Sequence, residues 1–175
     1  MPHDPYAGLP SVADFTLRSD DIAHDQKLAT AQLSGIFGAG GSDTSPHLAW
    51  SGAPEGTGSY VVTLYDPDAP TVSGFWHWAV FNLPASVTEL ASGAGDAEGS
   101  GLPAGAVTLR NDAGLRQFLG AAPPEGHGRH RYYTVVHALN VPALEVDADA
   151  TPAFLSFNLL GCTVGRAMLV PWYER

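Results

Sequence analysis

Short bursts of apolar residues, bounded by glycine, proline and other turn-forming residues, recur along the chain. Such bursts predict β-strands, because β-branched and aromatic side chains suit a pleated, half-buried surface. The clearest lie at 59–65, 75–83, 106–110 and 131–141, and weaker ones at 15–19 and 169–175.

One segment near the end of the chain has a helical pattern instead. Thr151 suits an N-cap, and Pro152 suits the first helical position. Apolar residues then recur at spacings of three or four, namely Phe154, Phe157, Leu160, Val164 and Met168. Gly161 and Gly165 weaken the pattern, so we expect the helix to end early.

Segments 34–58 and 84–130 have no strong period and are rich in Gly, Pro, Ser and Ala. Long loops in a compact domain are often functional or locally packed. Strands, long loops and one late helix predict a mostly β protein, an antiparallel β-sandwich with helical decoration. We expect residues 1–175 to form a single domain, with residues 1–13 as a loosely ordered N-terminal arm.

Composition and charge narrow the classes of partner. The formal net charge is -10, and no basic cluster is longer than GRHR, so nucleic acid is not an expected partner. No apolar run is long enough to cross a bilayer. A single cysteine, Cys162, and a first segment without a basic start or apolar core favour a cytoplasmic protein.

The common catalytic and nucleotide-binding motifs are missing. The Gly-rich stretches match neither GxGxxG nor a phosphate loop, and GxSxG, CxxC and HExxH do not occur. We therefore expect no cofactor and assign no catalytic residue.

The first candidate chemistry lies in YDPDAPTVSGFWHW, residues 65–78. Prolines fix their own backbone and push the preceding residue to an extended conformation, so Pro67 and Pro70 stiffen this segment. Asp66 and Asp68 would thus leave a strand end on a stiff backbone, which lowers the cost of holding a side chain in one place. The alternative is a plain proline-rich turn between strands.

A histidine follows on the next predicted strand. Strand alternation places His77 on one face with Ala79 and Phe81, away from Trp76 and Trp78. The tryptophans would then form structural backing. For a single histidine, a hydrogen-bonded core position is the alternative.

The third candidate is PPEGHGRHRYY, residues 123–133. If a strand begins near His130, then His130 and Tyr132 share one face and Arg131 takes the other. His127 could add a polar group from the loop. Elsewhere, His47 lies in a polar loop and is expected to be solvated.

Together, DPDAP, FWHW and APPEGHG leading into HRYY resemble the phosphatidylethanolamine-binding protein family, and its bacterial, Raf-kinase-inhibitor-like branch most of all. SPHLAWSGAP and WYER support the resemblance, which extends roughly from Phe15 to the last residue. It implies an antiparallel β-sandwich around a large sheet, with a small pocket for anions.

The resemblance also implies which residues form the pocket. Its expected ligand-binding residues are Asp66, His77, His130, Tyr132, Phe118, Gly120, Ala122 and Pro123. Its expected supporting residues are Asp68, Pro67, Pro70 and Arg131. Phe118 lacks the hydroxyl of the tyrosine that relatives often carry, and Ala122 stands where glycine or cysteine is common.

The expected function is binding of a small anion or phospholipid headgroup, with a possible regulatory role. His77, His130, Tyr132 and loop N–H groups can donate hydrogen bonds to a phosphate or carboxylate. Asp66 has three open roles: to fix a histidine tautomer, to stay protonated beside the anion, or to accept the ammonium of a zwitterion such as phosphoethanolamine.

Two other functions stay open. Segments 34–58 and 84–130 could present a surface that inhibits a kinase or protease. Asp66, His77 and His130 have the ligand types of a two-histidine, one-carboxylate metal site, as in a metal-dependent hydrolase. The family resemblance also favours a homodimer.

Overall fold

The computed structural model describes residues 3–175. Its elements, in chain order, are β1 (Ala13–Asp14), β2 (Thr16–Arg18), the 3₁₀ helix η1 (Thr30–Gln32), β3 (Leu48–Ser51), β4 (Ser59–Asp66), β5 (Phe75–Pro84), β6 (Glu89–Leu90), β7 (Val107–Thr108), β8 (His130–Arg131), β9 (Tyr133–Leu139), α1 (Pro152–Leu159), β10 (Thr163–Leu169) and β11 (Trp172–Tyr173).

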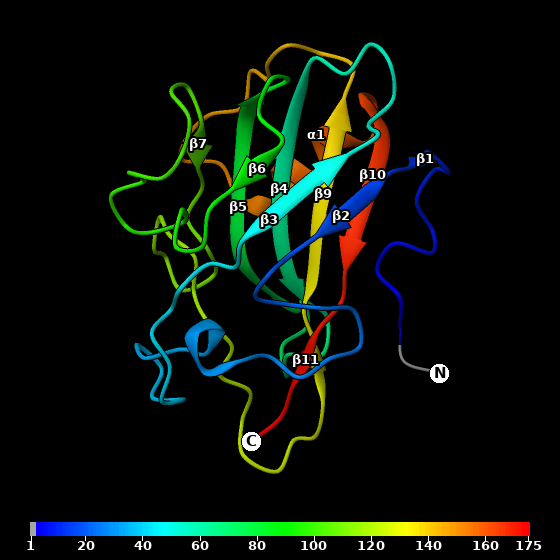
Figure 1. Ribbon diagram of the computed structural model, residues 1–175. Helices are drawn as coiled ribbons and strands as arrows, with labels where there is room; N and C mark the ends of the chain where they lie inside the picture. The colour runs from blue at the N-terminus through cyan, green and yellow to red at the C-terminus, as the bar shows by residue number, and fades with distance from the viewer. Residues whose placement is uncertain (1–2) are drawn as a thin grey trace.

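A six-stranded sheet in the order β1-β10-β9-β4-β5-β7 forms the centre of the molecule. Its strands run antiparallel to their neighbours except β1, which runs parallel to β10. A three-stranded sheet, β2-β3-β6, lies in front of it in Figure 1, and α1 lies behind. The predicted antiparallel β-sandwich with one short helix is thus confirmed.

Two apolar cores fill the layers on either side of the large sheet. The front core includes Trp50, Val62, Trp78 and Val136, all nearly or fully buried. The back core joins the sheet to α1 and includes Val61, Ala79, Phe81, Leu139, Leu155 and Leu159. Each central strand is therefore buried on both faces, which explains why β4 and β9 read as almost continuous apolar runs.

The helix was only partly predicted. Its start is confirmed, since the Thr151 side chain accepts a hydrogen bond from the Phe154 N–H at 3.1 Å. Its apolar face was wrong, because the buried helix residues are Pro152, Leu155 and Leu159, whereas Phe154, Phe157 and Leu160 are exposed. Val164 and Met168 belong to β10, since a spacing of four residues suits one face of a strand as well as of a helix.

Some strand predictions also need correction. The strand expected at 106–110 is only β7, and the one expected at 131–141 is interrupted at Tyr132. Segments 34–58 and 84–130 are not purely loops, since they hold β3 and β6. These strands are too short for a period-2 pattern to stand out.

His47 is buried rather than solvated, so that prediction was wrong. Its Nδ1 accepts a hydrogen bond from the Asp20 N–H at 3.1 Å, and its Nε2 lies 3.0 Å from Glu89 Oε1. The residue directly before β3 is thereby tied to the end of the neighbouring strand β6.

Residues 3–10 contact strands β8, β9 and β10. Tyr6 stacks on Tyr133 with ring centroids 5.8 Å apart, and the main-chain oxygen of His3 accepts a hydrogen bond from Arg131 at 2.9 Å. Arg166 reaches the carbonyl of Pro10 at 2.9 Å. These contacts tie the segment to all three strands.

Candidate functional site

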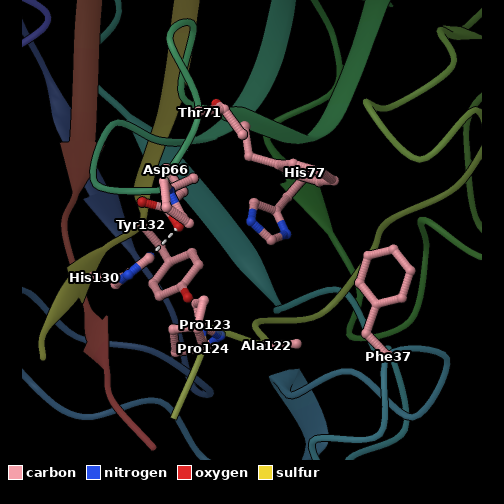
Figure 2. A pocket seen from close by; sticks show the side chains of 12 residues that line it. Phe37, Asp66, Thr71, His77, Ala122, Pro123, Pro124, His130 and Tyr132 are labelled. Carbon is pink, nitrogen blue, oxygen red and sulfur yellow. Dashed lines mark hydrogen bonds and ion pairs between the residues drawn. The ribbon is translucent and has the colours of Figure 1, made fainter. Parts of the chain in front are cut away.

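A cavity of about 170 Å³ lies beside the ends of β4 and β8 and the start of β5 (Figure 2). Its lining residues are Phe37, Asp66, Ala69, Pro70, Thr71, Phe75, His77, Ala122, Pro123, Pro124, His130 and Tyr132. Six of the eight residues expected to bind the ligand are among them, and they come from β4, β5, the loop at 122–123, and β8 with the residue after it.

The other two expected residues, Phe118 and Gly120, do not line this cavity. Phe118 is buried in the front core, where its ring meets Trp78 edge-on at 6.1 Å. The Gly120 N–H donates to Asp43 Oδ1 at 2.8 Å, and a Cβ on this glycine would collide with the main chain of Leu33. Both residues therefore anchor the loop from behind.

Asp66 and His130 form a buried pair at the floor of the cavity. His130 Nδ1 lies 2.7 Å from Asp66 Oδ2, and the two side chains are 1% and 4% exposed. The second oxygen of Asp66 accepts the Asp68 N–H at 2.8 Å. When Asp66 is ionised, both its oxygens accept, so Nδ1 of His130 carries the hydrogen and Asp66 fixes this tautomer.

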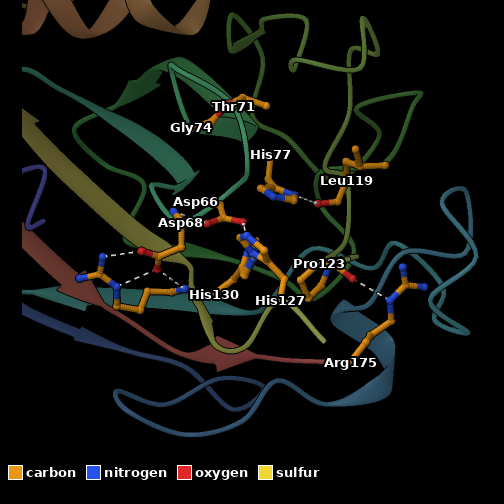
Figure 3. A network of polar contacts seen from close by, with 11 residues as sticks. Asp66, Asp68, Thr71, Gly74, His77, Leu119, Pro123, His127, His130 and Arg175 are labelled. Atoms are coloured by element: carbon orange, nitrogen blue, oxygen red, sulfur yellow. Dashed lines mark hydrogen bonds and ion pairs between the residues drawn. The ribbon is translucent and has the colours of Figure 1, made fainter. Parts of the chain in front are cut away.

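The other nitrogen of His130 is also occupied. His127 Nδ1 lies 2.7 Å from His130 Nε2, and the two rings are roughly edge to face. His127 is exposed and lies outside the cavity. Both nitrogens of the buried histidine thus have partners within the protein (Figure 3).

His77 reaches the cavity through an irregularity in the sheet. The partners along β4 and β5 step from Leu64 opposite Trp78 to Tyr65 opposite Trp76, which leaves His77 without a partner between them. The face predicted for His77 was therefore wrong: Ala79 and Phe81 pack in the back core, whereas His77 lines the cavity.

The hydrogen bond of His77 determines what it offers a ligand. Its Nδ1 lies 2.8 Å from the carbonyl oxygen of Leu119, so Nδ1 must donate. Burial lowers the pKa of His77, although this hydrogen bond and the charge of Asp66 act in the opposite direction. A neutral His77 therefore has an acceptor at Nε2, so it can hold an anion only after taking up a proton.

Tyr132 contributes a hydroxyl at the cavity wall (Figure 2). This oxygen is buried and has no hydrogen-bond partner among residues 3–175. Burial raises the pKa of Tyr132, and the charges of Asp66 and Asp68 add to the rise. The hydroxyl therefore keeps its proton and is an unused donor.

Asp68 lies outside the cavity and holds the neighbouring strand. Arg131 donates to its two oxygens from Nε at 2.8 Å and Nη2 at 2.7 Å, and the Arg131 N–H donates at 2.9 Å. Burial raises the pKa of Asp68, but the hydrogen bonds and charge of Arg131 outweigh it and lower the pKa overall. This pair fixes the end of β8 relative to the DPDAP turn.

The loop that carries Pro123 and His127 is held by Arg175. Arg175 Nε donates to the carbonyl of Pro123 at 2.7 Å (Figure 3). The carbonyl of Arg175 accepts the Gly126 N–H at 3.0 Å. Strand β11, just before Arg175, pairs with β8. The same segment therefore supports both the strand of His130 and the loop of His127.

The geometry does not favour a metal-dependent hydrolase. Within residues 3–175, no three side chains of His, Cys, Asp or Glu are placed to hold a metal ion. Asp66 and His130 face one another, and His77 uses Nδ1 on the carbonyl of Leu119.

Residues 3–175 also hold no helix long and apolar enough to cross a membrane.

Several features of the site had not been anticipated from the sequence. Phe37, Ala69, Thr71, Phe75 and Pro124 line the cavity, and the carbonyl of Leu119 orients His77. Ala69, Phe75 and Pro124 lie within the recognised motifs DPDAP, FWHW and APPEGHG, so their position alone could have suggested them. Phe37 comes from a distant loop, and a main-chain carbonyl leaves no trace in residue type.

Comparison with known proteins gives one consistent result. The family model described as phosphatidylethanolamine-binding protein matches residues 18–174. The Escherichia coli K12 protein YbcL is 45% identical over 162 residues, which cover 93% of this chain and 88% of YbcL. The crystal structure of YbcL is described as that of a new member of the mammalian PEBP family. It superposes on this chain with a TM-score of 0.90, and the match covers 93% of this chain and 99% of that chain.

More distant structures share the fold. A phosphatidylethanolamine-binding protein homologue from Chlamydia trachomatis superposes with a TM-score of 0.76 at 28% identity, covering 94% of this chain and 99% of that chain. A carboxypeptidase Y inhibitor, solved in complex with its cognate proteinase, has a TM-score of 0.53 at 18% identity, covering 92% and 82%. At that identity the likeness concerns the fold alone.

Proposed function

The chain belongs to the phosphatidylethanolamine-binding protein family, and on that premise we propose that it binds a small anion, such as phosphate or the phosphate of a phosphoethanolamine headgroup, in the cavity beside Asp66, His77 and His130. The observation that carries the proposal is the buried His130, oriented by Asp66 at 2.7 Å, next to a second buried histidine in an otherwise apolar cavity.

The size and walls of the cavity suit a small group. Its volume of about 170 Å³ is below the several hundred Å³ of drug-sized pockets. Pro70, Pro123 and Pro124 line it and have no N–H to donate. Side chains must therefore supply most donors, namely the two histidines and the Tyr132 hydroxyl.

Of the three roles open to Asp66, the tautomer-fixing one has the most support. Both oxygens already accept hydrogen bonds, from His130 and from the Asp68 N–H. An ammonium group would have to compete with these donors. We therefore expect the phosphate, rather than the amine, of phosphoethanolamine to dominate its recognition.

Titration calorimetry and phosphorus NMR with phosphate and with phosphoethanolamine test this proposal. Both compounds should bind, and His77→Ala and His130→Ala should each weaken binding by at least about tenfold, because a hydrogen bond between charged groups is lost. His24→Ala, at an exposed histidine, is the matched control. If neither compound binds, or if the two pocket variants bind like the wild type, the proposal fails.

A second candidate function, protein inhibition, is favoured by exposed apolar residues near the cavity. Phe37 lines the cavity and is 50% exposed, the adjacent Ile36 is 53% exposed, and Val72 is fully exposed beside Thr71. Exposed apolar side chains that gather in one place often mark a protein-binding surface. Inhibition assays against peptidases and protein kinases, with Ile36→Asp and Val72→Asp as disrupting variants, test it. Inhibition that these variants leave intact would count against this surface.

A further inference from the structure

The hydrogen bond between His127 and His130 bears directly on ligand entry. His130 lines the cavity, whereas His127 touches its other side from an exposed loop. The nitrogens concerned, His127 Nδ1 and His130 Nε2, are 2.7 Å apart. His130, the cavity-lining histidine that Asp66 orients, therefore has a partner at each of its ring nitrogens (Figure 3).

The contacts of the two histidines determine which of their ring nitrogens carry hydrogen. Asp66 only accepts, so His130 Nδ1 carries a hydrogen and Nε2 of the neutral ring has a lone pair. His127 Nδ1–H then donates to that lone pair. If His130 gains a proton, its Nε2–H can donate either to His127 or to an anion, but an imidazole nitrogen makes only one good hydrogen bond in the ring plane.

Little besides this contact holds the His127 side chain in place. Gly126 and Gly128 flank the histidine with φ of 73° and 90°, conformations that suit glycine. The hydrogen bond to His130 is the only one that the His127 side chain makes within residues 3–175. The rest of the loop is held independently, through Arg175 on Pro123 and Gly126.

Building on the proposed anion binding, we propose that His127 competes with the ligand for His130 Nε2. With the cavity empty, His127 occupies that nitrogen. An anion binds there only when the His127–His130 hydrogen bond opens and His130 takes up a proton from solvent, so that the new Nε2–H donates to the anion. His127 therefore determines affinity without belonging to the cavity wall, and it disfavours any anion too weakly bound to displace it.

Affinity measurements on the full chain test the competition. His127→Ala should bind inorganic phosphate about two- to tenfold more tightly than the wild type, the factor that corresponds to one net hydrogen bond. His24→Ala, at an exposed histidine far along the sequence, should bind phosphate like the wild type. Phosphate binding to His127→Ala that equals or falls below the wild-type affinity overturns the inference.

A second readout follows His127 itself. In nitrogen NMR spectra of the wild type, saturating phosphate should move the His127 ring signals toward those of the solvated His24. Unchanged His127 signals at saturation would also overturn the inference. If neither the wild type nor His127→Ala binds phosphate or phosphoethanolamine, the proposed function and the competition both fail. If the wild type binds phosphate and His127→Ala binds it no more tightly, the proposed function stands and the competition fails.

Discussion

Asp66 and His130 lie 64 positions apart in the sequence, yet their side chains meet at 2.7 Å in a region almost closed to solvent. Asp66 ends β4, and His130 begins β8, which follows a long irregular segment. A buried pair of this kind is strongly destabilised when one partner is lost, because the other is left uncompensated. Stability measurements can therefore reveal it without any ligand.

Asp66→Asn keeps the shape of the side chain and removes its charge. We expect the free energy of unfolding at pH 7 to fall by about 1.5–3 kcal/mol, the range for hydrogen bonds to charged groups. Urea denaturation measures the change. Asp112→Asn is the control, since Asp112 accepts the Trp76 N–H at 2.9 Å on the surface and should matter much less. Equal effects of the two variants would contradict the buried pair.

Asp68→Asn should reduce stability in a pH-dependent way. Arg131 lowers the pKa of folded Asp68 below its ordinary value near 3.8. The resulting stability is present above the unfolded pKa and is lost as pH falls through the folded pKa. The pair is partly exposed, so we expect a loss of roughly 1 kcal/mol at neutral pH that disappears in strong acid. A loss that persists at low pH would mean that packing, not charge, is responsible.

Anion binding should strengthen as pH falls. Burial lowers the pKa of His77 in the empty cavity, and an adjacent anion favours the protonated ring, so binding takes up a proton. Sulfate is a suitable probe, because it keeps its charge across the neutral range. Each proton taken up can raise the sulfate affinity by up to about tenfold per pH unit of acidification, and His77 supplies one of them.

His77→Gln separates this effect from the other histidines. In that variant the pH dependence of sulfate binding should become shallower by the contribution of one proton. Calorimetry in buffers of different ionisation enthalpy counts the protons directly. Sulfate affinity that is independent of pH, or that rises with pH, would show that His77 does not supply the donor.

Tyr132→Phe should separate a binding role from a structural one. The hydroxyl is buried without a partner, so its removal should leave the free energy of unfolding unchanged or raise it by about 1 kcal/mol. Phosphate binding should weaken nonetheless, because a donor is lost. A clear loss of stability would indicate that the hydroxyl has a structural partner instead.

His137, on the opposite side of β9, should make the free energy of unfolding sensitive to acid as well. Burial, with help from the charge of Arg166, lowers the pKa of His137 to about 3. Between its ordinary value of 6.5 and about 3, the unfolded chain binds a proton that the folded protein does not, so stability falls as pH falls.

His137→Phe should remove that dependence and make the stability curve flatter between neutral pH and pH 4. The difference between the wild type and the variant could approach about 5 kcal/mol over the full range. Denaturation by urea at several pH values measures it. Parallel curves for the two proteins would show that His137 takes up its proton without unfolding.

The central strands were predictable because their sequences are rich in the apolar residues that buried strands require. β4, β5 and β9 are rich in β-branched and aromatic residues and matched their expected ranges closely. β10 was hidden by a spacing that helices and strands share. β3 and β6 were too short to show alternation, and β6 pairs only two residues with β3.

The site was predictable as far as residue types and motifs identify it. Six expected residues line the cavity, but the way His77 reaches it depends on a register shift between β4 and β5. Register is set by pairing between distant segments, so alternation along one strand assigned His77 to the wrong face. The Leu119 carbonyl and the ring of Phe37 likewise come from folding, not from local pattern.

The order of the large sheet has a consequence for behaviour in concentrated solution. Its two outermost strands, β1 and β7, have only two residues each. Long, flat outer strands invite other chains to add by main-chain pairing, and very short ones discourage it. A mutation that lengthened β7 into the irregular segment around it would therefore create a long exposed edge strand. Its first effect would be aggregation through main-chain pairing, rather than loss of anion binding.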